Sequence, residues 1–239
     1  MVGPMRRIRL LLPTLTVLTL LPTPGTAQTG KRARDLGIPQ DGTPGPLNAI
    51  TDVPGVEVGM TTLISGQGRL VTGKGPIRTG VTAILPRGKA STRSVYAAWF
   101  TLNGNGEMTG TTWVQESGYL EGPVAITNTH SVGVVRDAII HWQARNKAIF
   151  QAWSCPLVAE TADGWLNDMN KFHVRAEHVF AALDGAQGGP VREGSVGGGT
   201  GMNCYGFKGG NGTSSRLVDL AGATYTVGAF LQCNFGDRQ

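Results

Sequence analysis

Residues 123–142 read PVAITNTHSVGVVRDAIIHW, a short apolar run followed by a longer segment with a different period. The run from Val124 to Asn128 shows no alternation of apolar and polar side chains, which is typical of a strand buried on both faces. After Ser131, a candidate N-cap, the period becomes helical. The apolar side chains on the predicted helix face are Val134, Val135, Ala138, Ile139 and Trp142. The stretch therefore predicts a buried strand that leads directly into a helix.

Further strands and one more helix lie on either side of this stretch. Gly80 to Pro86 is a β-rich run, and Val174 to Leu183 has helical spacing. Two more strands are predicted at Arg216 to Leu220 and at Thr224 to Asn234, and we expect the second of them to be buried because it is almost continuously apolar. Strands mixed with a few helices predict an α+β or layered α/β fold.

The first residues have the pattern of a secretory signal peptide. Three arginines within residues 6–9 precede an apolar run from Leu10 to Leu21, and Gly25-Thr26-Ala27 offers small residues for cleavage. The apolar run is too short to span a membrane. We therefore expect residues 1–27 to be removed, and the mature chain to be secreted or periplasmic.

The rest of the composition favours one exported domain without a nucleic acid or membrane partner. The three arginines of the signal peptide account for three of the five formal positive charges, which leaves +2 on the mature chain. No basic patch with interleaved aromatic side chains is present, so nucleic acid binding is not expected. Residues 28–50 are polar and rich in Gly and Pro, which predicts an extended N-terminal arm. We assign residues 51–239 to a single domain.

The chain has three cysteines, Cys155, Cys204 and Cys233. An odd number leaves at least one of them unpaired within the chain, and their spacing fits no zinc site. We predict that all three are buried, small apolar residues in or near strands, with a disulfide as the alternative.

Familiar catalytic motifs do not supply a nucleophile. No serine stands in G-x-S-x-G, and none is followed three residues later by lysine. His173 and His178 are five residues apart, so on a helix they would not share a face, and no metal site is expected. The chain also ends at Gln239 soon after an apolar strand. We therefore expect a further segment, which carries the nucleophile, downstream of this chain.

Five motifs resemble, in the same order, those of the L-aminopeptidase/D-esterase family, which includes the β-peptidyl aminopeptidases. They are Thr127–Ala138, Ala159–Asp168, Gly197–Met202, Phe207–Gly210 and Gln232–Gly236. The resemblance extends from about Leu36 to the last residue. It implies an α+β fold, an αββα sandwich similar to that of N-terminal nucleophile hydrolases but with distinct connectivity. Two stacked sheets would then lie between helical layers.

The resemblance also implies a division of the activity between two subunits. Members of that family cut themselves into a larger α and a smaller β subunit, and the new N-terminal serine of β is the nucleophile, with its own amine as the base. This chain would be the α part of such a serine aminopeptidase, inactive alone and in need of no cofactor. Its substrates would be short peptides, amides or esters with a free N-terminal amine, β-peptides among them. The αβ units would form a homo-oligomer.

Three residues of this chain match site positions of the family. Asn234 matches the asparagine that helps to form the oxyanion hole, where a neutral donor stabilises developing negative charge. Glu160 matches the acid that holds the substrate's amino group, and Trp165 would line the same pocket. Ala162 departs from the family, since a bulkier residue is expected there, which puts the pocket's shape in doubt. Simpler interpretations are a turn cap for Asn234, a solvated acid for Glu160 and a core aromatic for Trp165.

Two other functions are open at this point. One is an acetyltransferase of a similar self-cleaving fold, which normally uses a threonine nucleophile. The other is a secreted binding protein without catalysis. The first residue after the downstream cleavage point would distinguish these alternatives from a serine aminopeptidase.

Overall fold

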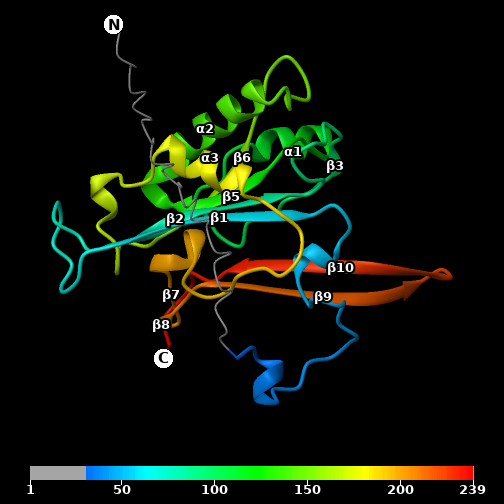
Figure 1. Cartoon of the computed structure of the whole chain (residues 1–239), viewed down its shortest axis with the longest axis horizontal. Helices are drawn as coiled ribbons and strands as arrows, with labels where there is room; N and C mark the ends of the chain where they lie inside the picture. The colour runs from blue at the N-terminus through cyan, green and yellow to red at the C-terminus, as the bar shows by residue number, and fades with distance from the viewer. Residues whose placement is uncertain (1–30, 239) are drawn as a thin grey trace, which may run out of the picture.

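A four-stranded sheet lies at the centre of the molecule (Figure 1). The computed structural model describes residues 31–238, so the predicted signal peptide at residues 1–27 lies outside the described residues. In spatial order the strands are β1 (Glu57–Ser65), β2 (Ile77–Leu85), β5 (Val124–Asn128) and β6 (Leu157–Thr161). β1 and β5 both pair with β2 in antiparallel fashion, whereas β5 and β6 run parallel. A parallel pair requires a crossover connection, and here the crossover contains a helix.

Two helices cover one face of this sheet (Figure 1). They are α2 (Val132–Arg145), which connects β5 to β6, and α3 (Ala176–Asp184). The core between helices and sheet contains Val81, Ala83, Val135, Ile139 and Leu183. Two sequence predictions need correction here. α3 begins two residues later than predicted, and Ser131 does not cap α2, because its side chain makes no capping hydrogen bond.

The opposite face of the sheet is covered by a β-hairpin of β9 (Asn211–Leu220) and β10 (Ala223–Gln232) (Figure 1). A tight 3-10 turn, η5 (Gly197–Gly201), lies between the two sheets. Gly80 on β2 permits this close approach, because a Cβ at that position would stand only 2.5 Å from the Gly197 carbonyl oxygen. Residues 31–238 thus supply two stacked sheets and the helical layer on one side of them.

Short elements complete the described part of the chain. The remaining strands are β3 (Val95–Tyr96), β4 (Tyr119–Leu120), β7 (Asn203–Cys204) and β8 (Phe207–Lys208), and the remaining helices are α1 (Thr111–Ser117) and the 3-10 turns η1 (Arg34–Leu36), η2 (Ile50–Asp52), η3 (Thr129–Ser131) and η4 (Met169–Lys171). None of the helices within residues 31–238 is long and apolar enough to cross a membrane.

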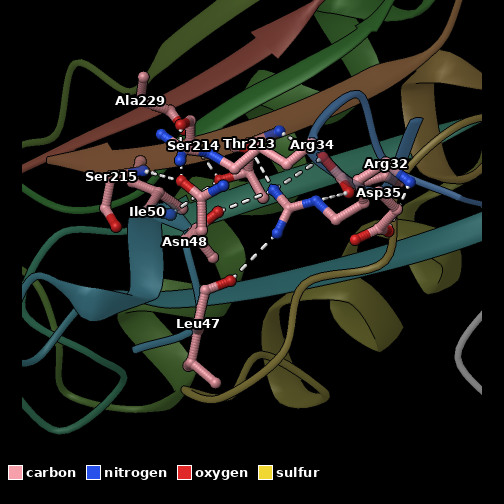
Figure 2. A network of polar contacts seen from close by, with 12 residues as sticks. Arg32, Arg34, Asp35, Leu47, Asn48, Ile50, Thr213, Ser214, Ser215 and Ala229 are labelled. Carbon is pink, nitrogen blue, oxygen red and sulfur yellow. Dashed lines mark hydrogen bonds and ion pairs between the residues drawn. The ribbon is translucent and has the colours of Figure 1, made fainter. Parts of the chain in front are cut away.

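The N-terminal arm is fastened to the hairpin by the guanidinium group of Arg32 (Figure 2). This group donates hydrogen bonds to the carbonyl oxygens of Leu47, Asn48 and Thr213 at 3.1, 2.8 and 2.6 Å. It also forms an ion pair with Glu193 at 2.8 Å. One side chain therefore satisfies carbonyl groups from the arm and from β9 at once, which fixes the arm across the hairpin.

The two strands that were predicted to be buried behave differently. β5 confirms its prediction, since Ala125 and Thr127 are fully buried. The prediction for Thr224 to Asn234 is wrong, because Tyr225, Val227 and Leu231 on β10 are 53%, 56% and 63% exposed. These side chains alternate along the strand and lie on its outer face, where Leu231 lines a cleft together with residues of the N-terminal arm.

The helical layer should carry much of the stability, which one pair of isoleucines can test. Ile139 on α2 is fully buried, whereas Ile64 on β1 is 60% exposed. We expect Ile139→Ala to lower the free energy of unfolding by about 2–5 kcal/mol, because it leaves a cavity in the core. Ile64→Ala should change it by no more than about 0.5 kcal/mol. Chemical denaturation of both variants measures this, and equal losses would contradict the assignment of the core.

Candidate active site

An open cleft of ≈ 850 Å³ lies where β5 and β6 end and the chain leaves β10. The structure brings all three predicted site residues, Glu160, Trp165 and Asn234, to the lining of this cleft. They come from β6, from the loop that follows β6, and from the segment after β10. The cleft is therefore built across the junction of the two sheets.

Glu160 is positioned by the parallel pairing of β5 and β6. It stands opposite Thr127 in the register, so the residue that follows β5, Thr129, lies beside its side chain. The Thr129 hydroxyl donates a 2.6 Å hydrogen bond to Glu160 Oε2, and the Glu160 peptide N–H donates to the carbonyl oxygen of Glu107 at 2.9 Å. Among the described residues Oε1 accepts no hydrogen bond, so it is available to a ligand.

The cleft is acidic. Glu107, Glu160 and Asp237 all contribute to its lining, and no Lys, Arg or His of the described residues does so. Carboxylates gathered without a cation favour a positively charged guest, and an alkylammonium group can donate up to three hydrogen bonds to them. A metal ion is a different kind of guest, and no group of three or more His, Cys, Asp or Glu within residues 31–238 is placed to hold one.

Asn234 holds together three segments that meet at the cleft. Its Oδ1 accepts a 2.8 Å hydrogen bond from the Ala162 N–H, and its Nδ2 donates to the carbonyl oxygens of Ala162 and Asn203 at 3.0 and 3.1 Å. Both N–H bonds of the amide are therefore engaged with the main chain. The side chain can donate to a ligand only if one of these two carbonyl groups gives it up.

Trp165 stands at the rim of the cleft rather than in the core, since it is 76% exposed. Ala162, the small residue at the position where the family resemblance predicted a bulkier one, also lines the cleft. A methyl group there leaves space next to Asn234 that a larger side chain would fill. The shape of the cleft near Asn234 thus depends on residue 162.

Sequence reasoning missed three contributors to the cleft: Thr129, Glu107 and Asn203. Thr129 had a usable signal, because it directly follows a predicted buried strand within a recognised motif, and side chains at the carboxyl ends of parallel strands commonly form sites. Glu107 and Asn203 had none, since they reach the cleft through loop and short-strand geometry.

The prediction of three buried, unpaired cysteines is wrong for all three of them. Cys204 and Cys233 form a disulfide, and Cys155 is free and exposed. The two partners are 29 residues apart in sequence and come together because the end of β10 lies beside β7. Their sequence neighbours are Asn203 and Asn234, so the disulfide fastens the same two segments that the Asn234 side chain joins.

The arrangement of motifs and site corresponds to a known peptidase family. Residues 48–239 match the family model described as peptidase family S58. The chain belongs to peptidase family S58. Two curated relatives of this S58 chain are beta-peptidyl aminopeptidases BapA. That of Sphingosinicella microcystinivorans is 63% identical over 209 residues, which cover 87% of this chain and 52% of the relative. That of Sphingosinicella xenopeptidilytica is 54% identical over 230 residues, 95% and 57% of the two chains. The chain thus spans about half the length of these relatives.

Solved structures agree with the S58 assignment. The L-aminopeptidase D-Ala-esterase/amidase of Ochrobactrum anthropi, described as a prototype of the serine aminopeptidases with a new variant of the Ntn hydrolase fold, superposes with a TM-score of 0.81. It is 51% identical, and the match covers 86% of this chain and 58% of that one. A Burkholderia sp. beta-aminopeptidase gives a TM-score of 0.80 at 52% identity, with coverages of 87% and 58%. The predicted family resemblance and the α+β fold class are confirmed.

The state of the cysteines provides a direct test of the site's architecture. We expect the denatured, unreduced protein to show one reactive thiol per chain, Cys155, and three after reduction. Thiol titration with and without reductant measures this, and Cys155→Ser is the matched control because it should bring the unreduced count to zero. Three reactive thiols before reduction would contradict the disulfide.

Proposed function

We propose that this chain is the larger part of a self-cleaving serine aminopeptidase that removes N-terminal residues from short peptides, amides or esters. The observation that carries the proposal is an acidic cleft, lined by Glu160 and Asn234, in a chain of peptidase family S58. The names of the two curated relatives favour peptides of β-amino acids as one substrate class. No cofactor is part of the proposal.

In this proposal Glu160 recognises the substrate's free amine. Its Oε2 is held by Thr129, so the carboxylate is already oriented when a substrate arrives. Oε1 then accepts a charge-assisted hydrogen bond from the ammonium group, which is stronger than a bond between neutral groups. Glu107 and Asp237 on the cleft wall add attraction for the cation at longer range.

Asn234 would act on the carbonyl group of the bond to be cleaved. One N–H of its amide would leave the carbonyl oxygen of Ala162 or Asn203 and donate to the substrate oxygen as negative charge develops there. The remaining hydrogen bonds would keep the amide in place. The Asn234 amide is uncharged, so it does not neutralise the carboxylates of the cleft, and these stay available to attract the substrate's ammonium group.

The nucleophile would come from a β subunit that is cut from the same precursor downstream of this chain. Two surfaces support such a partner. The outer edge of β10 pairs with no strand among residues 31–238, and the outer face of the hairpin exposes Tyr225, Val227 and Leu231. A second cleft of ≈ 740 Å³ lies on that side, between the N-terminal arm and residues such as Ala229. We expect the completed αβ units to associate further into a homo-oligomer.

Export to the periplasm or beyond is the localisation that we propose. Residues 1–27 have the pattern of a signal peptide. The disulfide between Cys204 and Cys233 fits an oxidising compartment, where such bonds persist.

Replacing the carboxylate of Glu160 tests the amine-binding role. In the complete protein, Glu160→Gln should lower kcat/KM for substrates with a free amine by roughly 10- to 100-fold, because a charged hydrogen-bond partner becomes neutral. It should have little effect on the same substrates after N-acylation. Glu107→Gln is the matched control within the same cleft and should reduce kcat/KM only slightly. Equal losses for acylated and free substrates would remove the role from Glu160.

The division of labour can be tested by expression. Residues 28–239 expressed alone should not hydrolyse a β-alanyl or D-alanyl amide, because an amine anchor and an oxyanion donor leave only a small residual rate without a nucleophile. Addition of the downstream segment of the gene should restore turnover together with a smaller, self-cleaved subunit that begins with serine. Robust turnover by residues 28–239 alone would overturn this division.

A further inference from the structure

A fully buried carboxylic acid lies directly behind the cleft and has no part in the function proposed above. Asp163 follows β6 and is 0% exposed. Its carboxyl group is surrounded by the side chains of Thr79, Asn128 and Asn167. No Lys, Arg or His within residues 31–238 forms an ion pair with it, although buried acids are normally paired.

The hydrogen bonds around Asp163 leave two oxygen atoms without donors. Asn167 Nδ2 donates to Asp163 Oδ1 at 3.1 Å, and Asn128 Nδ2 donates to the Thr79 hydroxyl oxygen at 2.9 Å. Asp163 Oδ2 and Asn128 Oδ1 are both buried and have no hydrogen-bond partner among residues 31–238. Leaving two buried acceptors unsatisfied is costly, and one added proton on the acid would satisfy both.

The packing around Asp163 favours this proton. A Cβ at Gly201 would stand 2.8 Å from Asp163 Cβ and would clash with the Arg78 carbonyl oxygen, so the absence of a side chain lets η5 close directly over the acid. Burial raises the pKa of the Asp163 carboxyl above its usual value, against the lowering effect of its polar neighbours Thr79, Asn167 and Asn128.

Charged and titratable groups on the surrounding elements are engaged elsewhere. The cations donate to main-chain carbonyl oxygens: Arg78 to those of Ser65 and Gly66, and Lys208 to those of Gly199 and Gly209. Among the acids, Asp168 accepts from the Gly73 N–H and Glu160 accepts from Thr129. His130 stacks on Phe172. None of them contributes to the shift of the Asp163 pKa. The protonation state of this acid is therefore set by burial and by its neutral neighbours.

We propose that Asp163 is held as a neutral acid that donates a hydrogen bond to Asn128 Oδ1 and thereby positions Ala162 against Asn234. The link to Asn234 is short, because the residue before Asp163 is Ala162, whose N–H and carbonyl oxygen both bind the Asn234 side chain. The Asp163 carbonyl oxygen also accepts from the N–H groups of Leu166 and Asn167, which anchors the loop on its other side. Asp163 is thus a positioning residue, and its effect on turnover rests on the function proposed above.

An amide can replace a neutral acid but not a carboxylate in this environment. In Asp163→Asn the side-chain NH₂ can donate to Asn128 Oδ1 while the oxygen still accepts from Asn167. Asp163→Ala removes both interactions and leaves a void. The two variants therefore separate the proposal from a general need for a side chain at this position.

The protonation state can be measured without reference to activity. In the full-length gene product at neutral pH, infrared spectroscopy should show the C=O stretching band of a protonated carboxylic acid. The band should disappear in Asp163→Asn and remain in the control Asp219→Asn, which changes an exposed acid at the hairpin turn. Absence of the band in the unaltered protein would overturn the proposal, since an ionised Asp163 would then be bound by a turned amide of Asn128.

Stability against pH gives a second measurement that does not depend on activity. The unfolded chain ionises Asp163 near the ordinary aspartate pKa of 3.8, whereas the folded chain keeps the proton to higher pH. Between these two pKa values the unfolded state binds fewer protons, so this acid makes the protein less stable as pH rises, and the effect is constant above the folded pKa. Asp163→Asn should lack this loss, and its Tm relative to the unaltered protein should rise with pH from about pH 4. An unchanged difference across that range would contradict the proposal.

Turnover completes the test. Asp163→Asn should keep kcat and KM close to those of the unaltered protein, whereas Asp163→Ala should lower kcat by up to about 100-fold with a smaller effect on KM, because the oxyanion donor loses its alignment. Equal losses in the two variants would overturn the positioning role. If the complete protein shows no peptidase activity at all, the proposed function fails, and the infrared and stability measurements still decide the state of Asp163.

Discussion

The parallel pairing of β5 with β6 is the constraint on which the site depends. It places Thr127 opposite Glu160 and Asn128 opposite Thr161, so both strands end at the same edge of the sheet. The hydroxyl of Thr129 can then hold Glu160, and the chain beyond Thr161 must turn across the junction of the two sheets. The crossover through α2 enforces this arrangement, because a parallel pair cannot be joined by a tight turn. A slip of one residue in the pairing would turn Glu160 to the other face.

The second sheet is attached at this edge by polar contacts rather than by a large apolar surface. The Gln232 amide donates to the Thr161 hydroxyl at 2.6 Å, and Asn234 bonds to both main-chain polar groups of Ala162. Such contacts have defined directions, unlike apolar packing, so they fix the orientation of β10 relative to β6. The disulfide of Cys233 adds a covalent connection next to Asn234. Precision at the cleft therefore comes from a few directed bonds at the end of β10.

The sequence predicted β2 and β5 of the central sheet but not β6, whose residues were identified only as part of a family motif. Val124–Asn128 is apolar, and residues 31–238 bury it between β2, β6 and α2. Thr224–Asn234 is similarly apolar, yet its outer face is exposed. An apolar composition indicates that a strand is suited to burial, but it does not identify the element that would cover it. The disulfide was not predicted for a related reason. Cys204 and Cys233 are far apart in sequence, and only the course of the chain through the second sheet brings them together. Family motifs, rather than hydrophobic periodicity, identified Glu160, Trp165 and Asn234 as candidate site residues, and all three line one cleft.

The distribution of acids follows from the dielectric environment of each one. Glu107, Glu160 and Asp237 face an open cleft, where water stabilises their charges until a cation replaces it. Asp163 lies one residue beyond Ala162, on the far side of the loop, where η5 closes over it and none of the cationic side chains within residues 31–238 pairs with it. A charge there would be poorly solvated and would also repel the carboxylates of the cleft. A neutral acid avoids both costs and still forms hydrogen bonds, so the same loop can present an acidic face to a ligand and a neutral face to the protein interior.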